Sequence, residues 1–155
     1  MLSYSVTVVT KYPDGWLLLI YKVPHEPSAN RVSTWRKLKR LGAILLHDAA
    51  WVLPSTPRTR EQLQWLASDI RDLGGDAYVW QGSLSLDGQE AALERQFLAQ
   101  VDPLYADILA GLEQPDADLA MLSRRYQQAR AQDYFSSPLG QRARDALLAA
   151  KGADR

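Results

Sequence analysis

One stretch, residues 16–54, constrains the fold of this chain more than any other. It begins with an unbroken apolar run over residues 16–21, continues through a basic amphipathic segment, and ends in two short apolar strings on either side of His47 and Asp48. An apolar run with polar ends is typical of a buried strand, and two strings joined by a tight polar turn are typical of an antiparallel pair. The stretch therefore predicts strand, helix, strand and strand.

The basic segment predicts a helix that begins near Ser28 and ends at Gly42. Apolar residues recur every three positions, which predicts one stripe packed against a partner: Val32, Trp35, Leu38 and Leu41. The opposite face is predicted to be cationic, because it carries Ser33, Arg36, Lys37 and Arg40. Arg31 projects on the same side as the apolar stripe.

The next residues predict a second helix and a fourth strand. Thr59 and Gln62 have the spacing of a capping box, and an apolar stripe before Gly74 follows: Leu63, Leu66, Ile70 and Leu73. Residues 77–81 then form a strand pattern. The order β-α-β-β-α-β predicts an α+β, ferredoxin-like domain over residues 16–82, with one antiparallel sheet and both helices on one face.

Residues 83–155 are predicted to form an additional C-terminal helical tail. Because its apolar residues would be costly to expose, the tail is expected either to pack on the domain as a single structural unit or to complete a dimer. Helices are predicted over 119–131 and 139–149, and a new helix can start at Pro103. Residues 1–15 leave two interpretations open. Residues 3–12 could be an extra edge strand hairpinned onto residues 16–21, or the segment is an N-terminal extension from an upstream start codon.

The composition excludes several classes of protein. With 46% hydrophobic residues and five tryptophans, the chain is not disordered. It has no cysteine and only two histidines, so we expect no disulfide and no metal site. It lacks a signal-peptide pattern and the apolar run of about 20 residues that a membrane span needs, so we expect a soluble cytoplasmic protein. It also lacks phosphate-loop and nucleophile motifs, so we expect no enzyme, catalytic residue or cofactor.

Charge is distributed unevenly along the chain, although the net charge is zero. Residues 16–60 carry eight basic and two acidic side chains, whereas residues 61–155 carry nine basic and fifteen acidic ones. Such polarity suits a protein with one face towards a polyanion, and it suits a self-complementary oligomer equally well.

Two groups of residues are candidate sites. The cationic helix face, Arg36, Lys37 and Arg40, could neutralise nucleic-acid phosphates, and the alternative is a solvated face without a partner. Arg31 on an apolar flank needs a carboxylate or an oxyanion, and Glu26 or Asp48 could be its internal partner. Asp48 itself is expected to cap its tight turn. Four tryptophans are predicted to pack in the core rather than to stack on bases: Trp35, Trp51, Trp65 and Trp80.

Several spaced motifs resemble one known family. The helix motif consists of Arg31, Trp35, Arg36, Leu38, Lys39, Leu41, Gly42 and Ala43, and a strand motif follows with Asp48, Leu53 and Pro54. A later segment contains Asp133, Tyr134, Phe135, Ser137 and Pro138. Together these motifs resemble the N-terminal domain of ChrB, the chromate-resistance regulator, in which Tyr134 would replace a Phe.

The resemblance implies a homodimeric, DNA-binding transcriptional regulator of a chromate-resistance operon that responds to chromate. On this interpretation, operator DNA would contact Arg36, Lys37 and Arg40, helped by Arg58 and Arg60. Arg31 and Lys39 would be the oxyanion-binding residues. Full-length family members carry a second, C-terminal domain, so chromate sensing could reside there instead.

The same strand and helix order is more distantly similar to small CRISPR-associated ferredoxin-like nucleases and to the middle domain of PaaX-type repressors. Those nucleases place a metal-binding Asp where this chain has Lys22, whose charge would repel a metal ion. Two alternatives to the regulator therefore stay open. One is a non-enzymatic interaction module without DNA binding, and the other is a degenerate metal-dependent nuclease that uses a carboxylate such as Asp48.

Overall fold

The structure, a computed structural model, describes residues 11–153. Its strands are β1 (Trp16–Lys22), β2 (Ile44–Leu46), β3 (Ala50–Pro54) and β4 (Asp76–Gly82). Helix α1 (Ser28–Leu41) connects β1 to β2, and α2 (Pro57–Asp72) connects β3 to β4. Three more helices follow: α3 (Gln89–Leu112), α4 (Leu119–Ala131) and α5 (Pro138–Ala153). The predicted α+β class, with one antiparallel sheet and a helical C-terminal part, is confirmed.

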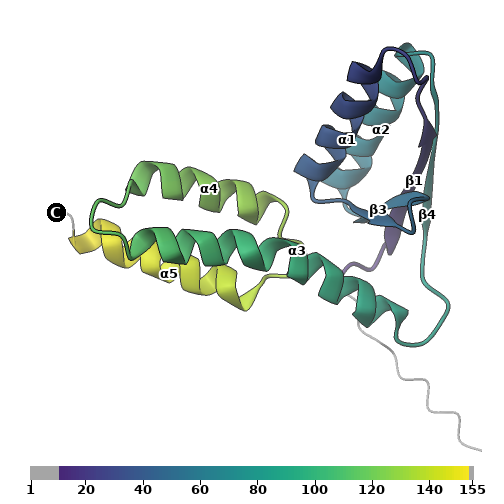
Figure 1. Ribbon diagram of the computed structural model, residues 1–155. Coiled ribbons are helices and arrows are strands. Elements are labelled where there is room, and N and C mark those ends of the chain that lie inside the picture. The colour runs from purple at the N-terminus through teal and green to yellow at the C-terminus, as the bar shows by residue number, and fades with distance from the viewer. Residues whose placement is uncertain (1–10, 154–155) are drawn as a thin grey trace, which may run out of the picture.

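The sheet has the strand order β2-β3-β1-β4, and every neighbouring pair is antiparallel. Strand β1 is hydrogen-bonded on both edges, since Leu17 lies opposite Leu53 of β3 and Gln81 of β4. Alternation along β1 points Leu17 and Leu19 towards α1 and α2, which lie on the same face of the sheet (Figure 1). The extra strand predicted over residues 3–12 lies outside the described residues, except for its last two positions.

The other face of the sheet is only partly covered. The ring of Trp16 stacks on Phe97 of α3 with a centroid distance of 5.7 Å, and Phe135 packs against both rings. Farther along the same face, Ile20 and Tyr78 lie opposite each other and remain largely exposed. The first half of α3 therefore covers one end of the sheet and leaves the other end open.

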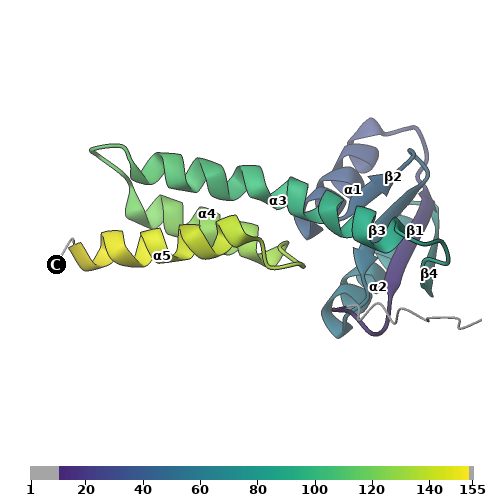
Figure 2. The same cartoon turned by 90° about the horizontal axis from the view of Figure 1, so that it is seen from below.

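The described residues form two apolar cores that share helix α3. The first half of α3 adds Leu93 and Phe97 to the core of the sheet. Its second half packs against α4 and α5 around a separate core of Val101, Tyr105, Ile108, Leu122, Ala129, Ala143 and Leu147. Figures 1 and 2 show these three helices extending away from the sheet as a helical arm. None of the helices within residues 11–153 is long and apolar enough to cross a membrane.

Helix α3 continues through Pro103, so the prediction of a helix start at this residue is wrong. A proline inside a helix removes one backbone hydrogen bond and strains the preceding turn. Here Val101 and Tyr105 are both buried on either side of the proline, and a break would expose them. The burial of these two side chains keeps the helix continuous.

The segment between α4 and α5 joins the two cores. The Tyr134 hydroxyl donates to the Leu41 carbonyl at 2.6 Å, and Gln100 donates to the next carbonyl, that of Gly42, at 2.9 Å. The last carbonyls of a helix have no partner within it, so these contacts satisfy the end of α1 from outside. Asp133 accepts hydrogen bonds from the Tyr105 hydroxyl and from the backbone of Ser137. The motif that resembles the ChrB segment is therefore a structural joint.

The predicted core assignment of the tryptophans is wrong for three of the four. Trp51 is buried, but Trp35, Trp65 and Trp80 are 49%, 67% and 60% exposed. On α1 the buried side chains are Thr34 and Leu38 rather than the whole predicted stripe. The Thr34 hydroxyl can be buried because it donates to the carbonyl of Asn30, one turn earlier, at 3.0 Å.

The capping box of α2 lies three residues before the predicted position. Thr56 is the N-cap and accepts a hydrogen bond from the backbone of Thr59, whose hydroxyl accepts one from the Thr56 backbone. Pro57 occupies the first helical position, where its fixed φ favours a helix start. Of the predicted apolar stripe, Leu63, Leu66 and Ile70 are buried, whereas its fourth member, Leu73, is exposed at the end of the helix.

Candidate functional site

Helix α1 carries five of the seven basic residues predicted to form sites, and all five are exposed. The helix begins after Pro27 and ends at Gly42, whose φ of 80° lies in the left-handed region that glycine tolerates. A side chain at Gly42 would also collide with Gln132 of the joint. These features fix the length of α1 and hold its basic residues on the surface of the first core.

Three of these residues, Arg36, Lys37 and Arg40, line one hollow of about 440 Å³ together with Val32 and small residues of the first turns. Lys37 forms an exposed ion pair with Asp69 of α2, with an N–O distance of 3.3 Å. No carboxylate within residues 11–153 pairs with Arg36 or Arg40. The structure therefore brings the predicted cationic face together, and two of its three cations have no carboxylate partner in the described part of the chain.

Arg58 and Arg60 lie in the first turn of α2 and make intramolecular contacts. Arg58 donates to the carbonyl of Ala131 at 3.0 Å, which ties α2 to the end of α4. Arg60 pairs with Asp14 at 3.2 Å and donates to the Ser55 hydroxyl at 3.0 Å. Neither residue lines the hollow on α1. Both make contacts that hold parts of the chain together, whether or not they also contact DNA.

Arg31 has no carboxylate partner in the described part of the chain. Its Nη1 atom lies 3.2 Å from Nδ1 of His25 and donates to that nitrogen, because a guanidinium has no acceptor. The internal ion pair with Glu26 or Asp48, one of the two options from the sequence, is therefore absent among residues 11–153. Lys39 lies apart from Arg31, with its ammonium 5.9 Å from the centre of the Trp35 ring.

Arg31 lines a larger cavity between α1 and the sheet, which we call the α1 pocket. The α1 pocket has a volume of about 720 Å³. Its wall is formed by β1 and the following loop, by α1, and by the β2–β3 hairpin. The lining side chains include Tyr21, Lys22, His25, Arg31, Val32, Trp35, Arg36, Leu45, Asp48 and Trp51. The sequence indicated this site only through Arg31, because the other walls come from separate elements.

Tyr21 reports the electrostatic environment of the α1 pocket. Burial raises the pKa of the Tyr21 hydroxyl, while a hydrogen bond with Trp51 and the positive charge of Arg31 lower it, and the burial effect is the largest. The phenol therefore stays neutral at physiological pH and can act as a hydrogen-bond donor. The positive charge of Arg31 therefore acts on the Tyr21 hydroxyl.

Asp48 enters the wall through a turn with an uncommon backbone. His47 and Asp48 have φ values of 50° and 58°, and the Ala49 amide donates to the Leu46 carbonyl at 2.9 Å. Two consecutive residues with positive φ are the geometry of a type I′ hairpin turn, which matches the twist of the flanking strands. The predicted tight turn is confirmed, and it presents Asp48 to the α1 pocket.

Residues 11–153 contain no candidate metal site. No group of three or more His, Asp or Glu side chains in this range lies close enough to hold a metal ion. Asp48, the carboxylate that an atypical nuclease would require, has no second carboxylate among the residues of the α1 pocket.

Comparison with known proteins identifies the family. The family model described as "Protein ChrB, N-terminal" matches residues 31–111, which run from α1 through most of α3. The chain is also 31% identical over 141 residues to Protein ChrB of Cupriavidus metallidurans, covering 83% of this chain and 43% of that relative. The chain thus spans less than half the length of this curated relative, and no solved structure matches it significantly. The chain belongs to the ChrB N-terminal family, the chromate-resistance family that its motifs resemble.

Proposed function

We propose that this chain is the DNA-binding module of a cytoplasmic transcriptional regulator of chromate resistance. The observation that carries the proposal is the exposed cationic face of α1, where Arg36 and Arg40 have no carboxylate partner in the described residues. Cations arranged along one helix face can neutralise successive phosphates and release their counterions. Membership of the ChrB family supports a regulatory role for such a face.

The fold that we propose for residues 16–82 is ferredoxin-like. Counted from β4, the strand order is β4-β1-β3-β2, so each connecting helix joins two strands that are separated by a third. A split β-α-β arrangement of this kind is the basis of the ferredoxin-like fold. It leaves the cationic side of α1 on the outside of the helical layer, where a duplex can reach it.

In this function the predicted residues have different roles. Arg36, Lys37 and Arg40 contact phosphates, and Arg58 and Arg60 extend the positive surface while they keep their intramolecular contacts. Arg31 and Lys39 are the oxyanion-binding candidates of the sequence, and Arg31 is the stronger of the two because it lines a pocket. The function that we propose is not enzymatic, because Lys22 stands where the distantly similar CRISPR-associated nucleases have a metal-binding Asp.

The test is a mobility shift with DNA from the region upstream of the gene, measured over a series of salt concentrations. Three phosphate contacts predict a slope of log affinity against log salt of about −2.7, and each Ala substitution at Arg36 or Arg40 should reduce that slope by about 0.9. Arg142→Ala, an exposed substitution on α5, is the matched control. An absent shift at low salt, or equal losses in the control, would refute the proposal.

Addition of chromate to the same assay separates binding from sensing. A shift that chromate releases would assign both activities to this chain. A shift that is indifferent to chromate would support DNA binding here and assign sensing to another part of the longer family members.

A second candidate function is an interaction module that forms a homodimer without binding DNA. Strand β4 favours it, because its seven residues are an edge strand of the sheet and include the exposed Tyr78, Val79 and Trp80. An exposed apolar edge strand is a template for pairing with another chain. Sedimentation would test it: a dimer in the absence of any DNA shift supports this candidate, and a monomer refutes it.

A further inference from the structure

The α1 pocket has apolar walls that nothing within the described chain covers. Val32 and Trp35 of α1 and Leu45 of β2 are 46%, 49% and 38% exposed, and all three line this one cavity. Side chains of this size are usually buried in a folded domain, and their exposure together marks a binding surface. The buried Trp51 forms the floor beside them.

The same pocket has an excess of positive charge. Arg31 and Arg36 both line it, His25 contacts Arg31, and Asp48 is the only carboxylate in the described wall. The first turn of α1 contains no acidic residue and no side-chain cap, so the positive end of the helix dipole adds to this potential. The pocket therefore attracts an anion from its α1 side.

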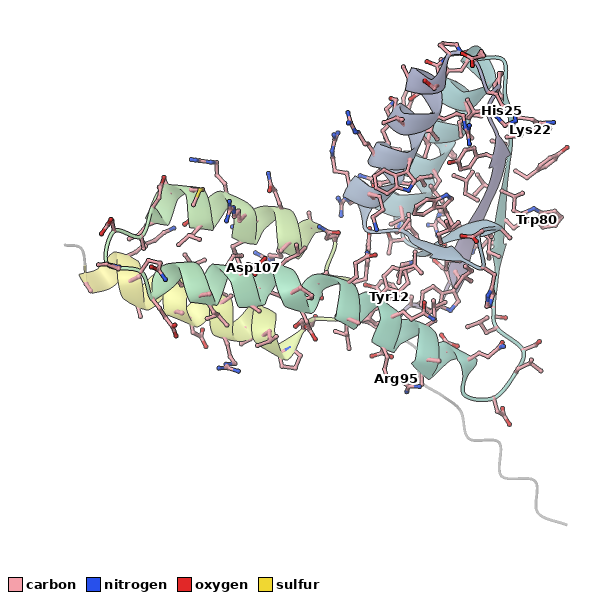
Figure 3. All side chains as sticks on the ribbon, viewed as in Figure 1. Tyr12, Lys22, His25, Trp80, Arg95 and Asp107 are labelled. Carbon is pink, nitrogen blue, oxygen red and sulfur yellow. The ribbon has the colours of Figure 1, made fainter. Side chains whose placement is uncertain are left out.

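Lys22 at the end of β1 also lines the pocket. Figure 3 shows its side chain projecting to the same side as that of Trp80, away from α1. Alternation along β1 explains this direction, because Lys22 shares the outer face with Ile20, whereas Tyr21 points towards the pocket. The two guanidinium groups of the wall, those of Arg31 and Arg36, both belong to α1.

The volume of the cavity selects the kind of anion. A tetrahedral oxyanion such as chromate has four oxygens and occupies on the order of 100 Å³, if each oxygen takes about the 30 Å³ of a water molecule. The pocket of about 720 Å³ is several times larger. It lies within the range of about 300–1,000 Å³ that is usual for organic ligands, and its aromatic walls suit a ring rather than an inorganic ion.

We propose that the α1 pocket binds a nucleotide, with the base against the Trp35 ring and the phosphate between Arg31 and Arg36. A phosphate dianion is a better ligand for two guanidinium groups than a single carboxylate is, because each guanidinium can donate a pair of parallel hydrogen bonds to its oxygens. Asp48 on the opposite wall accepts from a ribose hydroxyl or from an exocyclic amine, donors that a simple aromatic acid lacks. This site shares Arg36 and Val32 with the hollow beside Arg40, whereas Arg31 and Trp35 lie outside that hollow, so substitutions at Arg31 and Trp35 test the nucleotide site separately from the proposed DNA contact.

Titration of the purified chain with adenosine 5′-monophosphate tests the proposal, followed by calorimetry and by tryptophan fluorescence. Adenosine alone and inorganic phosphate alone should each bind at least about tenfold more weakly, since each satisfies one half of the site. Arg31→Ala and Trp35→Ala should weaken binding of the monophosphate by about tenfold or more. Both side chains are exposed, so the fold tolerates their truncation.

Two matched substitutions outside the pocket are the controls. Arg142→Ala removes an exposed arginine from α5, and Trp65→Ala removes an exposed tryptophan from α2. Neither should change the affinity for the monophosphate. Trp35→Phe should restore much of the binding lost in Trp35→Ala, because it keeps an aromatic face.

A short 5′-phosphorylated single strand distinguishes the source of the nucleotide. If it displaces the monophosphate, the site takes the end of a nucleic acid; if only the free monophosphate binds, the site takes a metabolite. Both results support a nucleotide site. No heat and no quenching at millimolar monophosphate, or equal losses in the pocket variants and the controls, would overturn it.

Discussion

Removal of one hydroxyl at the joint, by Tyr134→Phe, should destabilise the chain measurably at neutral pH. The Tyr134 hydroxyl donates a hydrogen bond to the Leu41 carbonyl, which lies at the end of α1 and has no partner within that helix. The Tyr134 side chain is buried. Loss of a hydrogen bond that leaves a half-buried carbonyl unpaired costs about 1–3 kcal/mol. For a domain of this size that loss corresponds to a decrease in Tm of about 2–10 °C.

The same hydroxyl makes a prediction about pH. Burial raises the pKa of Tyr134 to about 12, with smaller effects from Arg58, which lowers it, and from Tyr12, which raises it. The folded pKa lies above the unfolded value of about 10, so the stabilisation is complete below pH 10 and is lost as the pH rises towards 12. A difference of about two pKa units corresponds to about 3 kcal/mol in total and to about 1 kcal/mol at pH 11.

Urea unfolding of the wild type and of Tyr134→Phe at pH 7, 9 and 11 measures both effects. The difference in unfolding free energy should be constant from pH 7 to 9 and should shrink by about 1 kcal/mol at pH 11. Tyr78→Phe, at an exposed position on β4, should change stability by less than about 0.5 kcal/mol at pH 7. A difference for Tyr134→Phe that is the same at pH 7 and pH 11 would refute the reasoning.

Three other predictions concern the arm, the cationic face and the sheet edge. Gly140→Ala should destabilise the chain by about 1–3 kcal/mol in urea, because its Cβ would lie 2.8 Å from the Tyr105 ring, whereas Gly152→Ala on the same helix meets nothing and should be neutral or stabilising by up to about 1 kcal/mol. Asp69→Asn releases Lys37 from its ion pair and should raise DNA affinity in a mobility shift by about twofold to fivefold; unchanged affinity would exclude Lys37 as a contact. Val79→Lys places a charge at the edge strand and should weaken a dimer by at least about tenfold in sedimentation, and a dimer that persists would exclude β4 as its interface.

The order of the elements in the sheet domain could be predicted because each element has an unambiguous pattern. The run at residues 16–21, the glycine at 42 and the proline-rich approach to α2 each have one local interpretation, and the structure agrees with them. Local signals of this kind act within a few residues, so they need no knowledge of the tertiary structure.

The face that α1 buries could not be predicted from a spacing of three residues. Successive residues of a helix are about 100° apart, so each step of three drifts by about 60° around the axis. Val32 and Leu41 are three steps apart and therefore lie on nearly opposite sides. The structure buries the direction of Thr34 and Leu38 instead, and a buried threonine gives no apolar signal in the sequence.

The site could be predicted only in part. Arg31 is identifiable because an arginine beside an apolar stripe needs a partner, and this reasoning led to the α1 pocket. The remaining walls depend on tertiary contacts, since Leu45 and Asp48 come from a hairpin whose position against α1 no local pattern specifies. The same holds for Arg58, whose contact with Ala131 joins residues far apart in the sequence.

The continuity of α3 through Pro103 couples the two ends of the molecule mechanically. At about 1.5 Å per residue, its 24 residues form a helix about 36 Å long. One end packs on the sheet and the other packs against α4 and α5 in the arm (Figure 2). Near the middle of α3, Gln100 donates a hydrogen bond to the end of α1, and Tyr134 of the joint donates another. These contacts therefore fix the orientation of the arm relative to α1 and its cationic face.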